Sequence, residues 1–296
     1  MILVPQRLFT ADTVRVLARD GNHCALHKRL PQAQVAKEAY VANHVVSLVL
    51  NGRQVIRTYE GSVVSASAGE ALFLPRGVYY ITDLLPGGGG PFESLLFYFG
   101  DDAIHRFLAD TDVTEVNRDE APDHLKLTAG PGVAAFVRGC LGMSHAAPLT
   151  KPLLHLKTSE LLHLLHARVG GQALVRFLFR LTLPRRRNLR EFMEANVAKP
   201  LSVVDYAYLT GRSVSSFRRD FRAYFGTTPN KWLRYQRMQQ AVGLLAAGEM
   251  SVAELAYAVG YDNVSYFIRE FRKVTGQSPK QYMLTRRDDG RPPIEA

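Results

Sequence analysis

LSVVDYAYLTGRSVSSFRRDFRAYFGTTPNKW (residues 201–232) and MSVAELAYAVGYDNVSYFIREFRKVTGQSPKQY (residues 250–282) are two versions of one sequence. Positions up to the shared glycine, Gly211 and Gly260, match at an offset of 49, and positions after it match at an offset of 50. The second copy therefore has one additional residue just after that glycine. A repeat that keeps its core residues and changes length only in a turn indicates a duplicated supersecondary unit.

Each copy begins with a helix-capping pattern. Ser202 is followed three residues later by Asp205, and Ser251 is followed in the same way by Glu254. This spacing predicts a capping box, in which the serine oxygen and the acid each accept a hydrogen bond from a free backbone N–H. A short helix with an apolar side should follow, and the shared glycine then permits the positive φ of a turn.

A second helix is predicted in each copy, from about residue 213 to 224 and from about residue 263 to 274. Two short helices around a glycine turn form a helix-turn-helix, whose second helix can enter the major groove of DNA. An ordinary αα-hairpin is the alternative. DNA binding is favoured because the second helices carry the basic residues Arg218, Arg219, Arg222, Arg269, Arg272 and Lys273.

The positive charge of the chain is concentrated around the repeat. Residues 185–296 contain 19 Lys and Arg against 11 Asp and Glu, which is +8 of the total charge of +10, whereas residues 1–184 contribute +2. A phosphate backbone attracts such a segment, and counterion release makes the binding steeply salt-dependent. A merely solvated basic face would not explain the asymmetry.

The stretch from about residue 186 to 284 resembles the DNA-binding domain of AraC/XylS-type bacterial transcription regulators. The second copy carries that family's patterns A-x3-G-[FY], S-x-F-x3-F and G-x-[ST]-P-x2-[YF]. The resemblance covers about a third of the chain and implies two helix-turn-helix units joined by a long helix, here about residues 229–246. The good helix formers of that segment, which ends at Gly248, independently predict a helix.

Helix geometry and the resemblance together suggest which side chains contact DNA. Two phenylalanines four residues apart in each second helix should face the core, which leaves the opposite side free. The resemblance implies that the base-reading positions are Ser215, Arg218, Arg219, Val264, Ser265, Ile268 and Arg269. Arginine can pair with guanine, and apolar side chains can contact thymine methyl groups. We assign phosphate contacts to Ser202, Arg222, Lys231, Ser251, Arg272 and Lys273. For any single arginine, a solvated or ion-paired surface role is the alternative.

The N-terminal half is rich in strand patterns. An apolar run at 45–50, the tight-turn signal Asn51-Gly52 and an alternating run at 54–59 predict a strand, a turn and a returning strand. Residues 92–99 predict a further strand. Several short strands separated by Gly and Pro turns favour a barrel or a sandwich.

The segment GEALFLPRGVYY (residues 69–80) resembles the G-[DE]-x4-P-x-G turn of the cupin-like sensing domains that precede this DNA-binding domain in many AraC-type regulators. It implies a jelly-roll β-barrel with an interior pocket. Metal-binding cupins often have a histidine just after this turn, but Tyr79 and Tyr80 stand there. His44 is alone in a strand pattern and is more readily a structural histidine than a ligand. We therefore expect no metal site, no cofactor and no enzymatic activity.

The stretch LLHLKTSELLHLLHA (residues 153–167) predicts a strongly apolar helix. The resemblance implies that it contributes to dimerisation through Leu154, Leu161, Leu162 and Leu165. The alternative is packing of this helix onto its own barrel, and both can hold together. Its three histidines do not suggest a metal site, because no acid or cysteine cluster completes one.

These patterns predict an α+β protein. We expect a cupin-like (jelly-roll) β-barrel domain for sensing and dimerisation (residues 1–170), a linker (171–185), an all-α DNA-binding domain with two helix-turn-helix units (186–286) and a flexible tail (287–296). No apolar run approaches the roughly 18 residues that span a bilayer, and no signal peptide opens the chain. Two cysteines without metal-ligand spacing predict reduced thiols, so a cytoplasmic location is expected.

The predicted function is a sequence-specific transcription regulator, with activation favoured. The N-terminal half also resembles the branch of the AraC family that activates type III secretion and virulence genes, in which some members respond to a partner protein. The input is left open between a small-molecule effector and a regulatory protein. Expected partners are double-stranded promoter DNA, RNA polymerase and a second copy in a homodimer. Two alternatives remain, a sequence-tolerant architectural DNA-binding protein and a cupin enzyme that its basic domain only localises.

Overall fold

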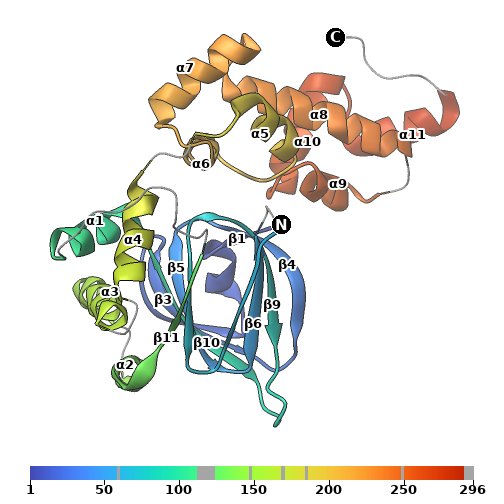
Figure 1. Cartoon of the computed structure of the whole chain (residues 1–296). Coiled ribbons are helices and arrows are strands. Elements are labelled where there is room, and N and C mark those ends of the chain that lie inside the picture. Colours follow the sequence, from blue (N-terminus) through green and yellow to red (C-terminus); the bar gives the residue numbers. More distant parts are fainter. Residues whose placement is uncertain are drawn as a thin grey trace. The chain divides into compact units, whose positions relative to one another are not determined.

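The computed structural model divides the chain into two compact units, Met1–Leu183 and Pro184–Ala296 (Figure 1). The first unit contains the strands and helices α1 to α4, and the second contains helices α5 to α11. The structure describes residues 1–58, 61–111, 124–146, 149–167, 171–183, 186–247 and 250–289.

The described strands of the first unit form two sheets. The five-stranded sheet has the order β1 (Ile2–Val4), β4 (Gln34–Val41), β9 (Gly77–Leu84), β6 (Arg53–Thr58) and β7 (Val63–Ser67). The six-stranded sheet has the order β11 (Leu125–Thr128), β8 (Glu70–Leu74), β5 (His44–Asn51), β10 (Phe92–Phe99), β3 (His23–Leu30) and β2 (Val14–Asp20). The pairing is antiparallel except between β1 and β4. No strand pairing among the described residues joins the two sheets, so the predicted barrel is a two-layer arrangement and not a closed cylinder.

The strands predicted on either side of Asn51-Gly52 are present, but they do not form a hairpin. β5 pairs with β8 and β10, whereas β6 pairs with β7 and β9 in the other sheet. Gly52 has φ +84°, and a Cβ there would lie 2.4 Å from the carbonyl oxygen of Leu84. The glycine therefore lets the chain pass close to β9 as it crosses between the layers, which local turn chemistry alone could not reveal.

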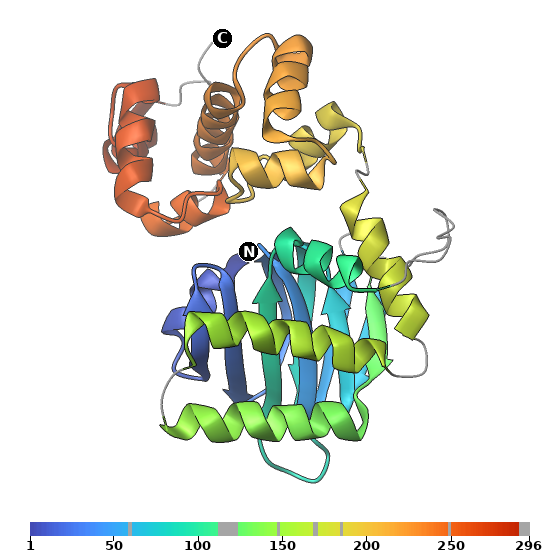
Figure 2. The same ribbon diagram turned by 90° about the vertical axis from the view of Figure 1, so that its left-hand side faces the viewer.

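Two apolar layers hold the first unit together. One lies between the two sheets and includes Leu26, Val45, Ile56 and Leu96. The other lies between the six-stranded sheet and helices α1 (Asp101–Ala109), α2 (Gly130–Ala146), α3 (Lys151–His166) and α4 (Gly171–Thr182). Figure 2 shows α2 and α3, in green, lying across one face of this sheet. Alternate residues of each strand of the shared sheet thus point into different cores.

The four leucines predicted to mediate dimerisation are buried inside their own chain. Leu154, Leu161, Leu162 and Leu165 are each at most 1% exposed and belong to the core between α3 and the six-stranded sheet. Side chains without accessible surface cannot contact a second copy directly. The structure therefore corrects this prediction in favour of its alternative, packing of the helix onto its own unit.

The range 171–185, predicted to be a linker, is largely helix. In α4, Leu174, Val175, Phe177 and Leu178 are buried in the same core, and the ring of Phe177 lies 5.1 Å from that of Phe73. The apolar spacing of these residues is that of a helix packed on one side. The linker prediction rested on the consecutive glycines at positions 170 and 171, which are typical of a hinge, and it overlooked this helical spacing.

His23 connects β3 to α3 through a buried hydrogen bond. One ring nitrogen lies 2.8 Å from the hydroxyl oxygen of Thr158, and the ring packs edge-on against His155 at 4.2 Å. Burial, followed by the charge of His155, lowers the pKa of His23 to about 4. The ring is therefore neutral in the folded protein at neutral pH. Weaker charge effects come from Asp20, Asp102 and Arg106.

This lowered pKa predicts acid sensitivity. In the unfolded chain His23 has a pKa near 6.5, whereas in the folded chain its pKa is about 4. Between these pH values the unfolded state therefore binds a proton that the folded state does not bind. The difference between the two pKa values corresponds to about 3 kcal/mol, which solvent screening of the partly buried ring reduces to about 2 kcal/mol. The free energy of unfolding should therefore fall by about 2 kcal/mol as the pH drops from about 6.5 towards 4. Urea unfolding at several pH values would measure this loss, and His23→Gln should reduce it while the exposed control His105→Gln should not. Identical pH dependence in both variants would contradict the assignment.

The two cysteines are free and fully buried. Burial raises the pKa of Cys24 to about 12 and that of Cys140 to about 11. Both thiols are therefore protonated and unreactive in the folded chain. Among the described residues, no helix combines the length and the apolar character needed to cross a bilayer.

The second unit consists of seven helices among its described residues. They are α5 (Leu189–Asn196), α6 (Val203–Leu209), α7 (Val214–Phe225), α8 (Pro229–Ala247), α9 (Val252–Ala258), α10 (Val264–Thr275) and α11 (Pro279–Asp289). The second helices of the repeat and the long joining helix lie within one or two residues of their predicted bounds. The predicted tail starts later than expected, because α11 continues to Asp289. Its remaining residues lie outside the described part.

Candidate nucleic-acid interface

Both predicted capping boxes are formed. The Ser202 hydroxyl accepts from the backbone N–H of Asp205 at 3.2 Å, and the Asp205 carboxylate accepts from the backbone N–H of Ser202 at 2.9 Å. The corresponding distances for Ser251 and Glu254 are 3.2 and 2.8 Å. Helices α6 and α9 therefore begin at equivalent positions of the repeat.

The turns of the two copies are also alike. Gly211 has φ +67° and Gly260 has φ +85°. In the first copy the N–H of Arg212 donates to the carbonyl of Ala207 at 2.9 Å, and in the second the N–H of Tyr261 donates to that of Ala256 at 2.9 Å. The additional residue of the second copy falls between this bond and the next helix, so it changes the approach to α10 without changing the turn itself.

The second helices, α7 and α10, are capped at both ends. The Ser213 hydroxyl accepts from the N–H of Ser216, and the Asn263 amide oxygen accepts from the N–H of Tyr266. Each helix ends at a glycine in the left-handed conformation, Gly226 and Gly276. Capping fixes the first turn, and the residues predicted to contact bases lie in that turn and the next.

Two buried phenylalanines hold each of these helices against its unit. Phe217 and Phe221 in α7, and Phe267 and Phe271 in α10, have no exposed surface. The ring of Phe221 lies 5.7 Å from that of Trp232, and the ring of Phe271 lies 5.6 Å from that of Tyr282. The aromatic packing repeats at the same offset as the sequence. The opposite face of each helix is therefore turned to solvent.

The residues predicted to read bases divide into two groups. Ser215, Arg218, Arg219, Ser265 and Arg269 are exposed. Val264 and Ile268 are half-buried and pack against the core cluster of the second copy. Only part of each of these apolar side chains is thus available to a thymine methyl group. Arg219 is 76% exposed, with its Nε 3.6 Å from a carboxylate oxygen of Asp220.

The residues predicted to contact phosphate are exposed, but three of them have partners within the chain. The hydroxyls of Ser202 and Ser251 act as helix caps. The Lys273 ammonium lies 2.8 Å from the carboxylate of Glu270 and is 67% exposed. Arg222, Arg272 and Lys231 are the remaining predicted contacts. The ammonium itself is exposed, so it can contact a phosphate while it stays close to the buried carboxylate of Glu270.

Sequence reasoning missed the buried carboxylate of Glu270 on the second recognition helix. Its side chain is 3% exposed and lies 2.7 Å from the Nε of Arg234 on α8. This pair holds α10 to the long joining helix. The charged sequence around Glu270 predicts an exposed side chain. Its ion pair with Arg234 on α8 explains why it is buried instead.

A second missed contact connects the second copy to the segment that leads into the first copy. Arg237 on α8 donates to the carbonyl oxygens of Val197 at 2.9 Å and Lys199 at 2.6 Å, which lie at the entrance to the first copy. Its guanidinium lies 5.7 Å from the ring of Tyr261, in the turn of the second copy. A Cβ on Gly260 would come within 2.5 Å of the carbonyl oxygen of Ala198. The turn of the second copy thus packs directly on the backbone segment that precedes the first copy.

Two helix-turn-helix units on one shared helix, each with a capped and exposed second helix, define a tandem helix-turn-helix DNA-binding protein. Residues 206–285 match the model of a helix-turn-helix domain family, and residues 44–177 match the model of the ExsA N-terminal regulatory domain. Among the described residues, no three His, Cys, Asp or Glu side chains come together to hold a metal ion.

Several characterised regulators are similar to the chain across both units. Thermoregulatory protein LcrF of Yersinia pestis is 26% identical over 81% of this chain and 88% of its own length. The virulence regulon transcriptional activator VirF of Yersinia enterocolitica is 27% identical over 74% and 81%. The HTH-type transcriptional regulator ExsA of Pseudomonas aeruginosa is 26% identical over 80% and 84%. The chain belongs to the AraC family of transcription activators and has an ExsA-like N-terminal regulatory domain. It is not an enzyme.

Proposed function

We propose that this activator places α7 and α10 in successive major-groove segments on one face of promoter DNA. The observation that carries the proposal is the exposed arginine-bearing face of each helix, opposite its two buried phenylalanines. Helices that enter one face of DNA are separated by about one helical turn of the duplex. One chain carries both helices, so binding requires no second copy. A homodimer stays a prediction, to be tested by sedimentation.

We assign direct base contacts mainly to the arginines, and a smaller part to apolar contact in the second copy. Arg218, Arg219 and Arg269 are long, exposed donors of the kind that pair with guanine. Val264 and Ile268 are half-buried, so we infer that recognition by α10 depends partly on how well its surface fits the shape of the groove. We assign the phosphate contacts to Arg222, Lys231, Arg272 and Lys273. Ser202 and Ser251, at the starts of α6 and α9, would lie near the DNA backbone.

We infer that the first unit is the regulatory domain and that its two-sheet core is cupin-like. The match of residues 44–177 and the covering of one sheet by α1 to α4 support this assignment. The DNA-binding domain would then comprise about residues 186–286. The helix of the range 171–185 would belong to the regulatory domain instead of to a linker.

We further infer that the target promoters belong to a virulence regulon and that the activator recruits RNA polymerase there, in the cytoplasm. This inference is supported by the similarity to VirF, a virulence regulon transcriptional activator, which spans both units. Sequencing the genomic fragments that the chain binds would identify the promoters and supply the DNA for the next experiment.

Arg219→Ala and Arg269→Ala should each weaken binding to a promoter fragment by roughly 5- to 150-fold, because each removes a contact to a base edge. Binding to random DNA of the same length should fall much less. Fluorescence anisotropy at fixed salt would measure both affinities. Equal losses on both DNAs would refute base reading by that arginine.

Lys231→Ala is the matched control for a phosphate contact. It should weaken binding to both DNAs alike and reduce the slope of log affinity against log salt by about 1. A wild-type preference for promoter over random DNA of less than about tenfold would instead favour a sequence-tolerant architectural protein.

A further inference from the structure

Asp220 is the one acidic residue in the sequence of α7, the first recognition helix. It stands next to Arg219, one of the residues assigned to base reading. DNA phosphates repel a carboxylate on a helix that approaches them, so such a residue weakens binding unless it has a separate role. The side chain of Asp220 is 23% exposed, and its two carboxylate oxygens have different partners.

One carboxylate oxygen of Asp220 is held by a buried arginine. The Nε of Arg212 donates to this oxygen at 3.1 Å, and the side chain of Arg212 is only 8% exposed. The same guanidinium donates through Nη1 to the backbone carbonyls of Thr210 at 2.8 Å and Arg187 at 3.0 Å. Three acceptors therefore fix Arg212 between the turn of the first copy and the segment that leads into it. A fixed arginine in turn fixes the carboxylate that it pairs with.

The other carboxylate oxygen faces the base-reading arginine. It lies 3.6 Å from the Nε of Arg219, whose side chain is 76% exposed. Because the contact involves the nitrogen nearest the alkyl chain, the two terminal Nη groups remain available for the O6 and N7 atoms of a guanine. A long side chain loses rotamer entropy when it adopts a single geometry. A fixed carboxylate removes part of that loss before DNA arrives.

The second copy differs at this point. Glu270 is the equivalent of Asp220, at the offset of 50, and it is likewise paired with an arginine, from α8. Its exposed partner, however, is Lys273, which is assigned to phosphate. The base-reading Arg269 instead has its guanidinium 5.8 Å from the centre of the ring of Tyr266. An acid beside a base-reading arginine is thus a feature of the first copy.

We propose that Asp220 is a positioning residue for DNA recognition, which holds the guanidinium of Arg219 in the geometry that reads a guanine. Arg212 anchors Asp220 and offsets its charge. Two guanidinium groups and one carboxylate leave a net charge of +1 on the three side chains, so the cluster as a whole still attracts DNA. The proposal rests on the function proposed above, in which Arg219 contacts a base edge.

Asp220→Asn tests the proposal, because it removes the charge and keeps an oxygen that can accept from Arg212. Affinity for a promoter fragment should fall by about three- to tenfold. Affinity for random DNA should not fall, and the loss of a repulsive charge should raise it by up to about threefold. Fluorescence anisotropy at one fixed salt concentration would measure both. An increase in both affinities, or an equal decrease in both, would overturn the proposal.

A double-mutant cycle shows whether Asp220 acts through Arg219. In the Arg219→Ala background, the added Asp220→Asn should no longer lower promoter affinity. Arg269→Ala is the matched background, because it removes the base-reading arginine of the other copy and leaves the first copy intact. There the same substitution should cause its full loss. An equal loss in the two backgrounds would show that Asp220 acts on binding by another route and would refute the assignment.

The motion of the Arg219 side chain separates this proposal from the proposed function. NMR relaxation of its Nε–H group, in the full chain without DNA, should show larger picosecond to nanosecond motion in Asp220→Asn than in the wild type. The exposed Arg218 is the control and should be unchanged. Equal mobility of Arg219 in both proteins would overturn the positioning role. Equal losses on promoter and random DNA in Arg219→Ala would instead refute base reading, while the relaxation data would still decide whether Asp220 holds Arg219.

Discussion

Gly260→Ala should destabilise the second unit by about 2–5 kcal/mol and abolish most promoter binding. Two costs add at this position. A residue with a side chain pays about 1–2 kcal/mol for the left-handed conformation that Gly260 adopts at φ +85°. The new Cβ would also lie 2.5 Å from the carbonyl oxygen of Ala198, and relieving that overlap costs about a further 1–3 kcal/mol.

Gly276→Ala is the matched control for this prediction. Gly276 has φ +78°, but no atom lies within 4 Å of its added Cβ. Its substitution should therefore carry only the conformational cost of about 1–2 kcal/mol. Urea unfolding of the full chain, followed by the fluorescence of Trp232 in the second unit, would compare the two variants. Equal losses of stability would refute the close packing of Gly260 against the backbone at Ala198.

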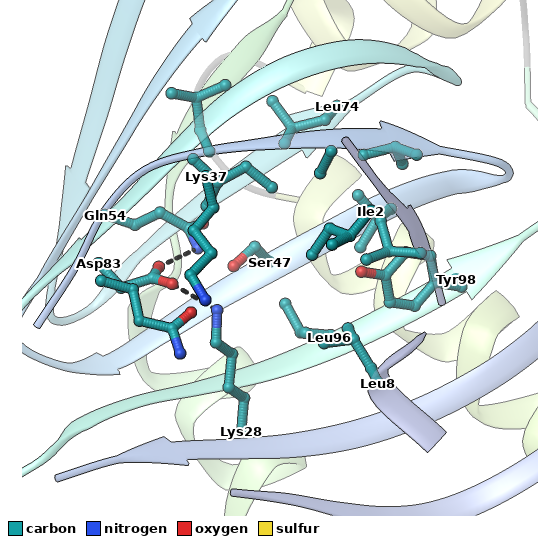
Figure 3. A pocket seen from close by; sticks show the side chains of 17 residues that line it. Ile2, Leu8, Lys28, Lys37, Ser47, Gln54, Leu74, Asp83, Leu96 and Tyr98 are labelled. Carbon is teal, nitrogen blue, oxygen red and sulfur yellow. Dashed lines mark hydrogen bonds and ion pairs between the residues drawn. The ribbon is translucent and has the colours of Figure 1, made fainter. Parts of the chain in front are cut away.

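In the first unit, the buried carboxylate of Asp83 on β9 forms an ion pair with the ammonium of Lys28 on β3 (Figure 3). Asp83→Ala should destabilise this unit by about 3–5 kcal/mol, because it leaves the buried Lys28 ammonium without its counterion. The Gln54 amide would lose its acceptor in the same step. Removing one partner of a buried pair is costly even where the pair itself adds little net stability. Thermal unfolding of the full chain, read from the circular dichroism of the sheets, would measure the loss.

Two variants separate this explanation from a general loss of packing. The double substitution Lys28→Met and Asp83→Leu removes both charges and should recover most of the stability. Glu160→Ala removes one partner of the exposed Lys157–Glu160 pair and should cost at most about 1 kcal/mol. A double variant as unstable as Asp83→Ala would show that shape, and not the unpaired charge, causes the loss.

The second unit could be predicted from the sequence almost in full because its signals are local. Caps, glycine turns and phenylalanines four residues apart act within one or two helical turns, and the duplication shows each of them twice. The contacts of Arg234 and Arg237 could not be predicted in this way. Their partners, Glu270 and the backbone near Ala198, lie more than 30 positions away along the chain.

The first unit was less predictable because its organisation depends on pairing between distant strands. The apolar run of β5 and the alternating pattern of β6 predicted these strands correctly, but the chain changes sheets between them. The buried cluster of Lys28, Gln54 and Asp83 was not anticipated either, since these residues come from three strands. The apolar pattern of α3 predicted that the helix is buried. It did not indicate whether the covering surface belongs to the same chain or to a second copy.

The arginines of α8 have a consequence for how promoters of this activator can evolve. Arg237 fixes the entrance of the first copy and Arg234 fixes the second recognition helix, so one rigid helix sets the interval between them. Bases in a binding site can then change one at a time, each with a graded loss of affinity. Inserting or deleting a single base pair between the half-sites would misplace one helix entirely. We expect the genomic sites of this protein to vary in sequence but to keep one length.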